Sequence, residues 1–208
     1  MKLLLATHNE HKRRELERIL ARGAGRPRWE LETLPASVAL PPEDGETFAE
    51  NALGKARAAA FALGRVSIAD DSGIAAAALG GAPGVRSARY AGEHATDAEN
   101  LEKLVREAPP GSRLEYVCAL AYVDPASGEE RMFEGRCAGT MAARPRGERG
   151  FGYDPVFVPE DGQPAGAGAS APTMAELSDE HKDAISHRGR AARALLAWLE
   201  DRAAPRSG

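Results

Sequence analysis

The sequence contains few aromatic residues, few cysteines and no excess of positive charge. Only 5% of the 208 residues are aromatic, and the formal net charge is -4. General nucleic-acid binders and membrane-surface proteins carry a basic excess, so both classes are disfavoured. The two cysteines, Cys118 and Cys137, fall on expected paired strands, which makes a disulfide geometrically conceivable. Without a secretion signal, two buried and reduced thiols are favoured instead.

Long apolar runs are also missing. The apolar stretch from Leu3 to Ala6 is followed at once by polar residues, which makes it too short for a signal peptide. No stretch approaches the roughly 20 apolar residues that span a bilayer. With 43% hydrophobic and 28% charged residues, the chain is typical of a soluble globular protein. We therefore expect a cytoplasmic protein with neither membrane nor nucleic acid as partner.

Strand and helix signals alternate along the chain. Three Thr-x-x-Glu capping boxes, beginning at Thr47, Thr96 and Thr173, predict helix starts. Two more helices are expected, one through 15–20 and one from Ser186 as its N-cap to about Leu199. The expected strands are 2–6, 29–34, 65–69, 114–123, 130–141 and 156–158. Strands interleaved with helices, plus one hairpin around 124–128, predict an α/β protein with a mixed sheet.

Two adjacent acids, Asp70 and Asp71, follow an expected buried strand and enter a predicted turn with Ser72 and Gly73. Adjacent like charges repel each other, so a positive group beside them is favoured, and a divalent cation supplies one most simply. Carboxylate oxygens suit Mg²⁺ or Mn²⁺. The alternative is a solvated turn, because Asp, Ser and Gly all favour turns.

A polar loop from Thr7 to Lys12 joins the first expected strand to a helix. Strand, loop and helix N-terminus together form a geometry that receives anions, and Lys12 adds a charge for a phosphate. The alternative is that Asn9 only caps the helix and Lys12 is solvated. His8 and His11 lack a third metal ligand of suitable spacing nearby. Lys55 lies near the edge of an apolar helix stripe, where solvated lysines are usual.

Two further features point to a ligand. Residues 151–154 place two aromatic rings between glycines and a carboxylate, which suits stacking on a flat base, although such a turn packed on a core is commoner. His187 and Arg188 fall in the first turn of the last helix, where cations are disfavoured unless an anion joins them.

Six motif blocks follow one another along the chain: Thr7-His8-Asn9-x-x-Lys12, Glu43 ahead of Thr47-Phe48-x-Glu50-Asn51-Ala52-x-x-Lys55-Ala56, Ala69-Asp70-Asp71-Ser72-Gly73, Gly81-Ala82-Pro83-Gly84-Val85-x-Ser87-Ala88-Arg89-Tyr90, Gly150-Phe151-Gly152-Tyr153-Asp154-Pro155 and Lys182-x-x-Ile185-Ser186-His187-Arg188. Together, in this order, they resemble the inosine triphosphate pyrophosphatase family, whose bacterial members are dITP/XTP pyrophosphatases. The resemblance extends from Lys2 to about Leu199.

The resemblance implies an enzyme that hydrolyses non-standard purine nucleoside triphosphates (ITP, dITP, XTP) to the monophosphate and pyrophosphate. It also implies an elongated α/β fold in which a central mixed sheet is flanked by helices, with two lobes, an active-site cleft between them, and a homodimer. We expect one domain over 1–208, a flexible insertion at about 159–172 and a disordered tail at about 203–208.

The resemblance also assigns residues. Glu43, Asp70 and Asp71 resemble the acids that bind Mg²⁺, which Mn²⁺ can replace, and Asp71 resembles the general base. The resemblance implies that the other motif residues contact the triphosphate or grip the purine and its 6-oxo group: Thr7, His8, Asn9, Glu10, His11, Lys12, Lys55, Ser72, Phe151, Gly152, Tyr153, Asp154, Lys182, His187 and Arg188. Two alternatives stay open: a purine-nucleotide-binding module that lost its chemistry, and a metal-dependent phosphatase of another phosphorylated metabolite.

Overall fold

The computed structural model describes residues 2–21, 29–162 and 171–203. Its strands are β1 (Lys2–Leu5), β2 (Glu30–Thr33), β3 (Ser67–Ala76), β4 (Arg113–Asp124), β5 (Glu129–Met141) and β6 (Phe157–Pro159). Its α-helices are α1 (Glu10–Ala21), α2 (Phe48–Leu63), α3 (Asp97–Glu107), α4 (Asp179–Ile185) and α5 (His187–Ala203). Short 3-10 helices cover Ala77–Leu79, Gly84–Arg89, Asp154–Val156 and Met174–Glu176.

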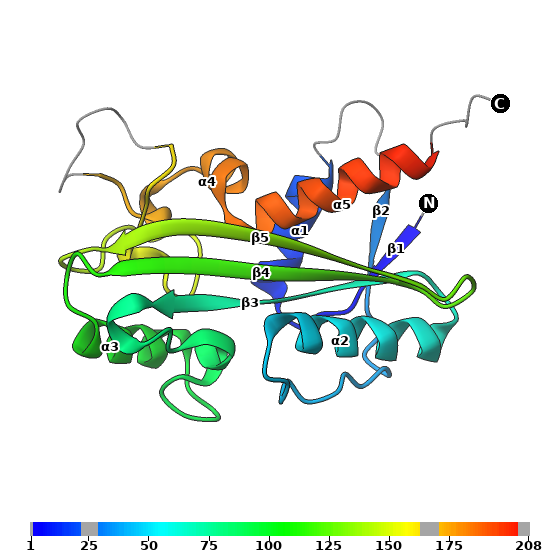
Figure 1. Cartoon of the computed structure of the whole chain (residues 1–208), viewed down its shortest axis with the longest axis horizontal. Helices are drawn as coiled ribbons and strands as arrows, with labels where there is room; N and C mark the ends of the chain where they lie inside the picture. Colours follow the sequence, from blue (N-terminus) through cyan, green and yellow to red (C-terminus); the bar gives the residue numbers. More distant parts are fainter. Residues whose placement is uncertain (1, 22–28, 163–170, 204–208) are drawn as a thin grey trace. The chain divides into compact units, whose positions relative to one another are not determined.

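The six strands form one mixed sheet in the order β2-β1-β3-β4-β5-β6 (Figure 1). β1 pairs in parallel with both β2 and β3, whereas β6 pairs antiparallel with β5. A four-residue connection joins β4 to β5 as a hairpin. The predicted α/β class with a mixed sheet and flanking helices is confirmed.

The chain divides into two compact units, and β3, β4 and β5 contribute residues to both. Unit 1 comprises residues 1–71, 119–135 and 188–208, and unit 2 comprises residues 72–118 and 136–187. The chain passes between the units four times: between Asp71 and Ser72, Cys118 and Ala119, Gly135 and Arg136, and His187 and Arg188.

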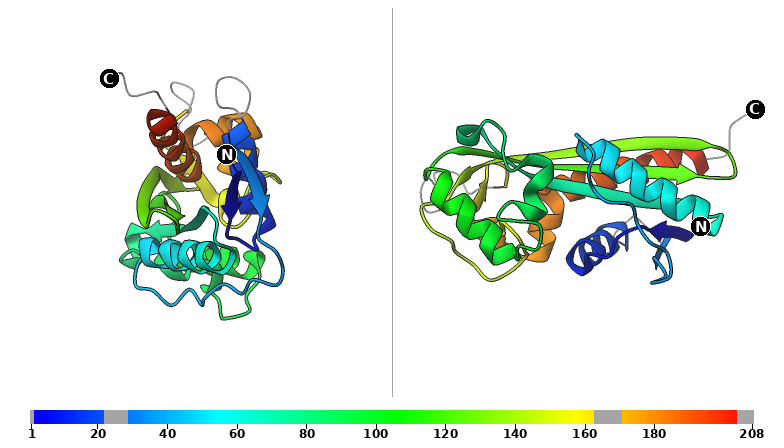
Figure 2. Two further views of the ribbon diagram at one scale, coloured as in Figure 1. Left: turned by 90° about the vertical axis from the view of Figure 1, so that its right-hand side faces the viewer. Right: turned by 90° about the horizontal axis from the view of Figure 1, so that it is seen from below.

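The core of unit 1 forms where α2 packs on the sheet. Leu4 of β1 and Ala6, just after this strand, both join the cluster that contains the alanines of α2. Ala52, Ala56 and Ala59 are fully buried, because small side chains let the helix approach the strands closely. Figures 1 and 2 show α2 on one face of these strands and α1 and α5 on the other.

Unit 2 has its own core, in which side chains of α3 meet those of β3, β5 and β6. Leu104 of α3 is fully buried in the same cluster as Ile74 and Phe157. Cys118 and Cys137 are both buried as thiols in this structure, and their reduced state in the cell stays a prediction.

Local signals placed most helix ends correctly. The capping boxes at Thr47 and Thr96 both form, and Gly64 ends α2 with a φ of 61° in the left-handed region. The box at Thr173 also forms, but it starts only a 3-10 turn, and the following helix begins at Asp179 with Ser178 as its cap. The predicted insertion around 159–172 and the tail at 203–208 lie largely outside the described residues.

The predicted turn at residues 70–73 is wrong, because β3 continues without interruption to Ala76. Pairing with neighbouring strands satisfies the backbone there, and this outweighs the turn preference of Asp, Ser and Gly. Gly73 serves close packing: a Cβ at this position would lie 2.6 Å from the Gly84 carbonyl oxygen and 2.3 Å from Ser87 Oγ. The acids therefore lie within a strand.

Helices long and apolar enough to cross a bilayer do not occur in the described parts of the chain.

Candidate active site

In unit 1 the loop after β1 delivers Lys12 to the acids of β3. Asn9 caps α1, because its side-chain oxygen accepts the backbone N–H groups of His11 and Lys12 at 3.0 and 3.1 Å. The capping role considered for Asn9 is thus confirmed. Lys12, however, is not solvated: its Nζ lies 3.3 Å from Asp70 Oδ2 and 4.0 Å from Asp71 Oδ1. Parallel pairing of Leu5 with Ile68 explains this approach, since the chain after β1 and the continuation of β3 leave this pair in the same direction.

Of the other residues from 7 to 11, Thr7 is half-buried and the rest are exposed. Thr7 Oγ1 accepts the backbone N–H of Asn9 at 3.1 Å. Glu10 accepts hydrogen bonds from Arg13 and Arg14 of its own helix, and the bond from Arg13 is the main reason that its pKa falls to about 2. The Glu10 carboxylate is therefore engaged by arginines of its own helix. His8 and His11 lie at the surface.

Helix α2 contributes a second lysine. Lys55 is only 4% exposed, so the solvated alternative is excluded. Its Nζ donates to the Asp70 carbonyl oxygen at 2.8 Å, contacts the Glu43 carboxylate and lies 4.0 Å from Asp71 Oδ1. Two lysines and three carboxylates therefore share one small region of unit 1.

The two adjacent aspartates differ in their electrostatics. Burial alone would raise the pKa of Asp70, but the charges of Lys12, Arg188 and Lys55 outweigh burial and lower it well below its ordinary value. At Asp71 burial prevails over the two lysines, and the pKa is raised. Neighbouring carboxylates with opposite shifts suit different tasks: Asp70 stays ionised, whereas Asp71 is the better proton acceptor.

Arg188, in the first turn of α5, is bound to carboxylates of unit 1. Its Nε and Nη2 donate to Asp70 Oδ2 at 3.2 and 3.1 Å, and its Nη1 donates to Glu15. The anion expected near this cationic helix start is therefore supplied by the protein itself. Arg188 is 2% exposed, and its predicted contact with a purine base stays a prediction.

The acids of unit 1 suit a magnesium ion by their donor chemistry. Glu43, Asp70 and Asp71 offer only hard oxygen donors, and all three contact or approach the same lysines. As the described side chains stand, no group of three His, Cys, Asp or Glu residues has the spacing of a metal site. The ammonium groups of Lys12 and Lys55 lie between the carboxylates, so the lysine side chains would need to move away from the acids to admit the ion.

In unit 2 the other predicted residues gather around the buried carboxylate of Asp154. Asp154 Oδ2 accepts hydrogen bonds from Lys182 Nζ at 2.5 Å and from the Phe151 backbone N–H at 2.9 Å. Its Oδ1 accepts the hydroxyl of Tyr116 at 3.2 Å. The Tyr116 ring in turn stacks on His187, with ring centroids 4.5 Å apart and planes 8° apart.

The two aromatic residues of the 151–154 block have different surroundings. The half-buried ring of Phe151 lies 5.1 Å from Lys182 Nζ, so a ring face and a cation are adjacent. Tyr153 is buried in the core of unit 2, and its hydroxyl donates to the Ser87 carbonyl oxygen at 2.7 Å. Gly152 is anchored through its N–H, which donates to Asp97 at 3.1 Å. The alternative considered for this block, an aromatic ring packed in the core, therefore holds for Tyr153 and not for Phe151.

Comparison with known proteins identifies the family. A sequence profile of the Ham1 family matches residues 3–198. The chain belongs to the Ham1 family. A dITP/XTP pyrophosphatase from Corynebacterium diphtheriae is 47% identical over 204 residues, covering 94% of this chain and 95% of its own length. Another from Mycolicibacterium paratuberculosis is 47% identical, with 95% of both chains covered.

Solved structures agree with this membership. A HAM1 protein from Coxiella burnetii superposes with a TM-score of 0.80 at 35% identity, covering 97% of this Ham1 chain and 99% of its own. A nucleoside-triphosphatase / dITP/XTP pyrophosphatase from Mycobacterium abscessus has a TM-score of 0.68 at 43% identity, with 96% and 99% covered. The resemblance inferred from the six motif blocks is thereby confirmed.

Sequence reasoning missed three buried polar residues of this Ham1 chain. Glu15 lies on the same face of α1 as Lys12, Asn51 lies one turn before Lys55 on α2, and Tyr116 contacts Asp154. A signal existed for the first two, because a polar side chain three or four residues from a functional one shares its helix face. Tyr116 had no such signal, since it meets Asp154 only through the tertiary fold.

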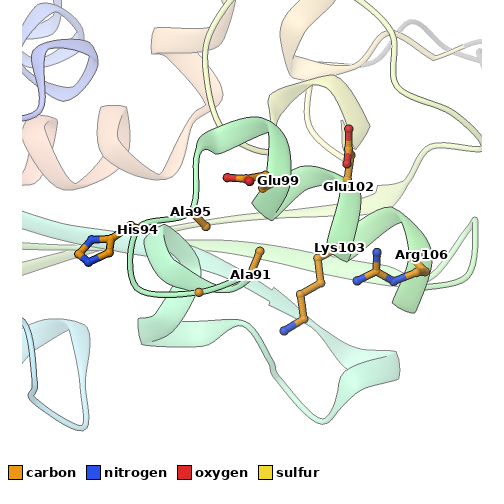
Figure 3. Close-up of a pocket in the computed structure, with 8 residues that line it drawn as sticks. Ala91, His94, Ala95, Glu99, Glu102, Lys103 and Arg106 are labelled. Carbon is orange, nitrogen blue, oxygen red and sulfur yellow. The ribbon is translucent and has the colours of Figure 1, made fainter.

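An open hollow of 540 Å³ on unit 2 contains none of the predicted site residues (Figure 3). Its walls come from residues 91–95 and from the exposed side of α3. Lys103, the lysine in this wall, donates to the Tyr90 carbonyl oxygen at 2.7 Å and lies over the Tyr90 ring. Because none of the acids, lysines or aromatic residues of the two groups described above lines this hollow, we assign it no role.

Proposed function

We propose that this chain hydrolyses non-standard purine nucleoside triphosphates, such as dITP, ITP and XTP, to the monophosphate and pyrophosphate. The observation that carries the proposal is the cluster of Lys12, Lys55, Glu43, Asp70 and Asp71 in unit 1. Membership of the Ham1 family and the names of the relatives support it.

The triphosphate would bind at the cluster of unit 1. Lys12 and Lys55 provide positive charge for phosphate oxygens, and the exposed residues His8 and Asn9 precede the positive end of α1. Glu43, Asp70 and Asp71 would hold Mg²⁺, which when bound neutralises charge on the phosphates and on the leaving group. Mn²⁺ satisfies the same donor set.

Asp71 would act as the general base. Its carboxylate, with a pKa raised by burial, takes a proton from water as the water oxygen bonds to phosphorus. The bond between the α- and β-phosphates breaks, and pyrophosphate leaves. Asp70 would remain ionised throughout, because Lys12 and Arg188 lower its pKa. Ser72, the next residue of β3, would contact the substrate beside this base.

The purine base would bind at the group of unit 2. Phe151 offers a half-buried ring for stacking, and Lys182 supplies an ammonium group beside that ring. A donor directed at the base edge pairs with a 6-oxo group but meets only hydrogens on the 6-amino group of adenine. Lys182 and His187 are the donors of unit 2 proposed for this selection. Arg188 remains a predicted base contact only, because its donors bind Asp70 and Glu15 in unit 1. Asp154, Gly152 and Tyr153 would keep the Phe151 loop in place.

A substrate panel tests the proposal. Purified protein is incubated with Mg²⁺ and dITP, ITP, XTP, dATP or dGTP, and the phosphate products are identified. We expect pyrophosphate and a monophosphate from the first three substrates and little turnover of dATP. Release of orthophosphate would instead indicate a phosphatase, and stoichiometric binding without product would indicate a silent binding module. We further propose that the protein is a homodimer and that it acts on the cytoplasmic nucleotide pool. Size-exclusion chromatography with light scattering tests the oligomeric state.

A further inference from the structure

The pentapeptide Thr-x-Ala-Glu-Asn occurs twice, at residues 47–51 in unit 1 and at 96–100 in unit 2. In both copies the Thr and Glu form a capping box, and the Asn is the fourth residue of the helix. Asn51 is 5% exposed and Asn100 is 2% exposed. In both, the side-chain oxygen accepts a backbone N–H from the preceding loop at 2.8 Å, from Gly45 and from Ala91 respectively.

The two asparagines differ in what their amide nitrogen contacts. Asn100 Nδ2 donates to the Ala88 carbonyl oxygen at 3.0 Å, so this asparagine only joins backbone segments. Asn51 Nδ2 donates to Asp71 Oδ2 at 2.9 Å. In the same local structure, the asparagine amide therefore binds a backbone carbonyl in unit 2 and the carboxylate of the proposed general base in unit 1.

The orientation of the Asn51 amide is determined by its partners. Gly45 offers a donor and Asp71 an acceptor, so only one of the two amide orientations satisfies both bonds. The approach of Gly45 is close: a Cβ there would lie 2.7 Å from Asn51 Oδ1 and 2.9 Å from Glu50 Cβ. Gly45 is two residues beyond Glu43, so Asn51 links the segment that carries Glu43 to the carboxylate of Asp71.

The bond from Asn51 also orients the second oxygen of Asp71. With Oδ2 bound to the amide, Oδ1 faces Lys12 and Lys55, each with its Nζ at 4.0 Å. Asn51 and Lys55 are one helical turn apart on α2, so one helix face presents both contacts. A neutral amide holds the carboxylate in place without adding a full charge to the cluster.

We propose that Asn51 is a positioning residue for the reaction: its amide holds Asp71 Oδ2 and ties the Glu43 segment to it, so that Asp71 Oδ1 is ready for Mg²⁺ once the lysines move away from the acids. This inference rests on the proposed function and deepens it. Hydrogen-bonding partners of metal-binding carboxylates typically change metal affinity or activity about 10- to 100-fold when removed. Asn51 makes no predicted contact with substrate, so its removal acts through Asp71 and Glu43.

Asn51→Ala and Asn100→Ala form a matched pair, because each removes a buried amide with two hydrogen bonds at the same helix position. The first measurement is the rise in melting temperature on titration with Mg²⁺ alone, which reports binding without turnover. The second is the Mg²⁺ dependence of dITP hydrolysis. For Asn51→Ala we expect the Mg²⁺ concentration for half-maximal effect to rise about 10- to 100-fold, with a lower kcat. For Asn100→Ala both responses to Mg²⁺ should match the wild type.

The inference is overturned if Asn51→Ala keeps the wild-type Mg²⁺ response, or if both variants weaken it equally. Should Asn51→Ala fail to fold, Asn51→Leu replaces it, since leucine keeps a side chain of similar size and adds no charge while removing the donor to Asp71. A wild-type protein that hydrolyses no triphosphate refutes the proposed function. In that case the melting-temperature response to Mg²⁺ still decides whether Asn51 supports the acid cluster.

Discussion

Neutralising Asp70 and neutralising Asp71 should have opposite effects on stability, although the two residues are adjacent. Asp70 is fully buried, and its Oδ2 accepts two bonds from Arg188 and lies 3.3 Å from Lys12. Asp70→Asn removes one negative partner from each cation, leaving the buried Arg188 with Glu15 and Lys12 with the more distant Asp71. Breaking a buried ion pair on one side costs about 3–5 kcal/mol. For a chain of this size that corresponds to a melting temperature lower by roughly 6–20 °C.

Asp71→Asn should instead leave stability unchanged or raise it in metal-free buffer at neutral pH. Burial raises the pKa of Asp71, so the folded state favours its protonated form. Such a group adds stability below its ordinary pKa of 3.8 and loses that contribution as pH rises through the raised value. Asparagine resembles the protonated form at every pH, and its advantage over the wild type should therefore vanish near pH 3.

Asp70 has the reverse dependence on pH. Its pKa is lowered, so its contribution to stability is complete above 3.8 and disappears as pH falls through the lowered value. The assay is thermal unfolding of both variants and the wild type in EDTA across pH 3–8. Dithiothreitol keeps the two thiols reduced throughout. Equal destabilisation by the two substitutions at pH 7 would refute the electrostatic distinction between the two aspartates.

Turnover of dITP should also fall about 10²- to 10⁴-fold in Asp71→Asn, because a general base is lost. Unchanged turnover in this variant would contradict that role.

Three further outcomes are expected. Phe151→Ala should weaken dITP binding by about 1–3 kcal/mol if the ring stacks on the base, measured as KM, and a change confined to the melting temperature would favour a packing role alone. Lys182→Met should lower stability by about 3–5 kcal/mol, because it leaves the buried carboxylate of Asp154 without its cation. Adding Asp154→Asn should recover part of that loss in thermal unfolding, and strict additivity of the two effects would argue against a direct pair. Removal of divalent ions with EDTA should abolish hydrolysis and added Mg²⁺ should restore it, whereas full activity in EDTA would exclude a metal-dependent reaction.

Much of the secondary structure could be predicted because its causes are local. The capping boxes at Thr47 and Thr96 satisfy backbone N–H groups with side chains three residues away, and both form as predicted. Gly64 ends α2 because glycine adopts a positive φ easily. The box at Thr173 forms as well, but only a 3-10 turn follows, since a cap satisfies a helix start without determining how far the helix continues.

Local preference failed where backbone partners come from distant strands. Asp70, Asp71, Ser72 and Gly73 all favour turns, yet they lie within β3 because the sheet supplies their hydrogen bonds. Local sequence patterns also could not predict which carboxylates the cationic side chains contact. Lys55 occupies a position typical of solvated lysines but is buried against the acids, and Arg188 binds Asp70, which lies 118 residues away in the chain.

The sequence alone determined the α/β class, the family and the identity of the residues that carry charge or aromatic rings, because these depend on composition, short-range hydrogen bonding and ordered motifs. Only the tertiary structure decided which cation faces which carboxylate. Coulomb energies and the cost of burial depend on distance and solvent exposure, and both arise when the strands and helices pack together. The opposite pKa shifts of Asp70 and Asp71 follow from that packing, although the two residues are neighbours in the chain.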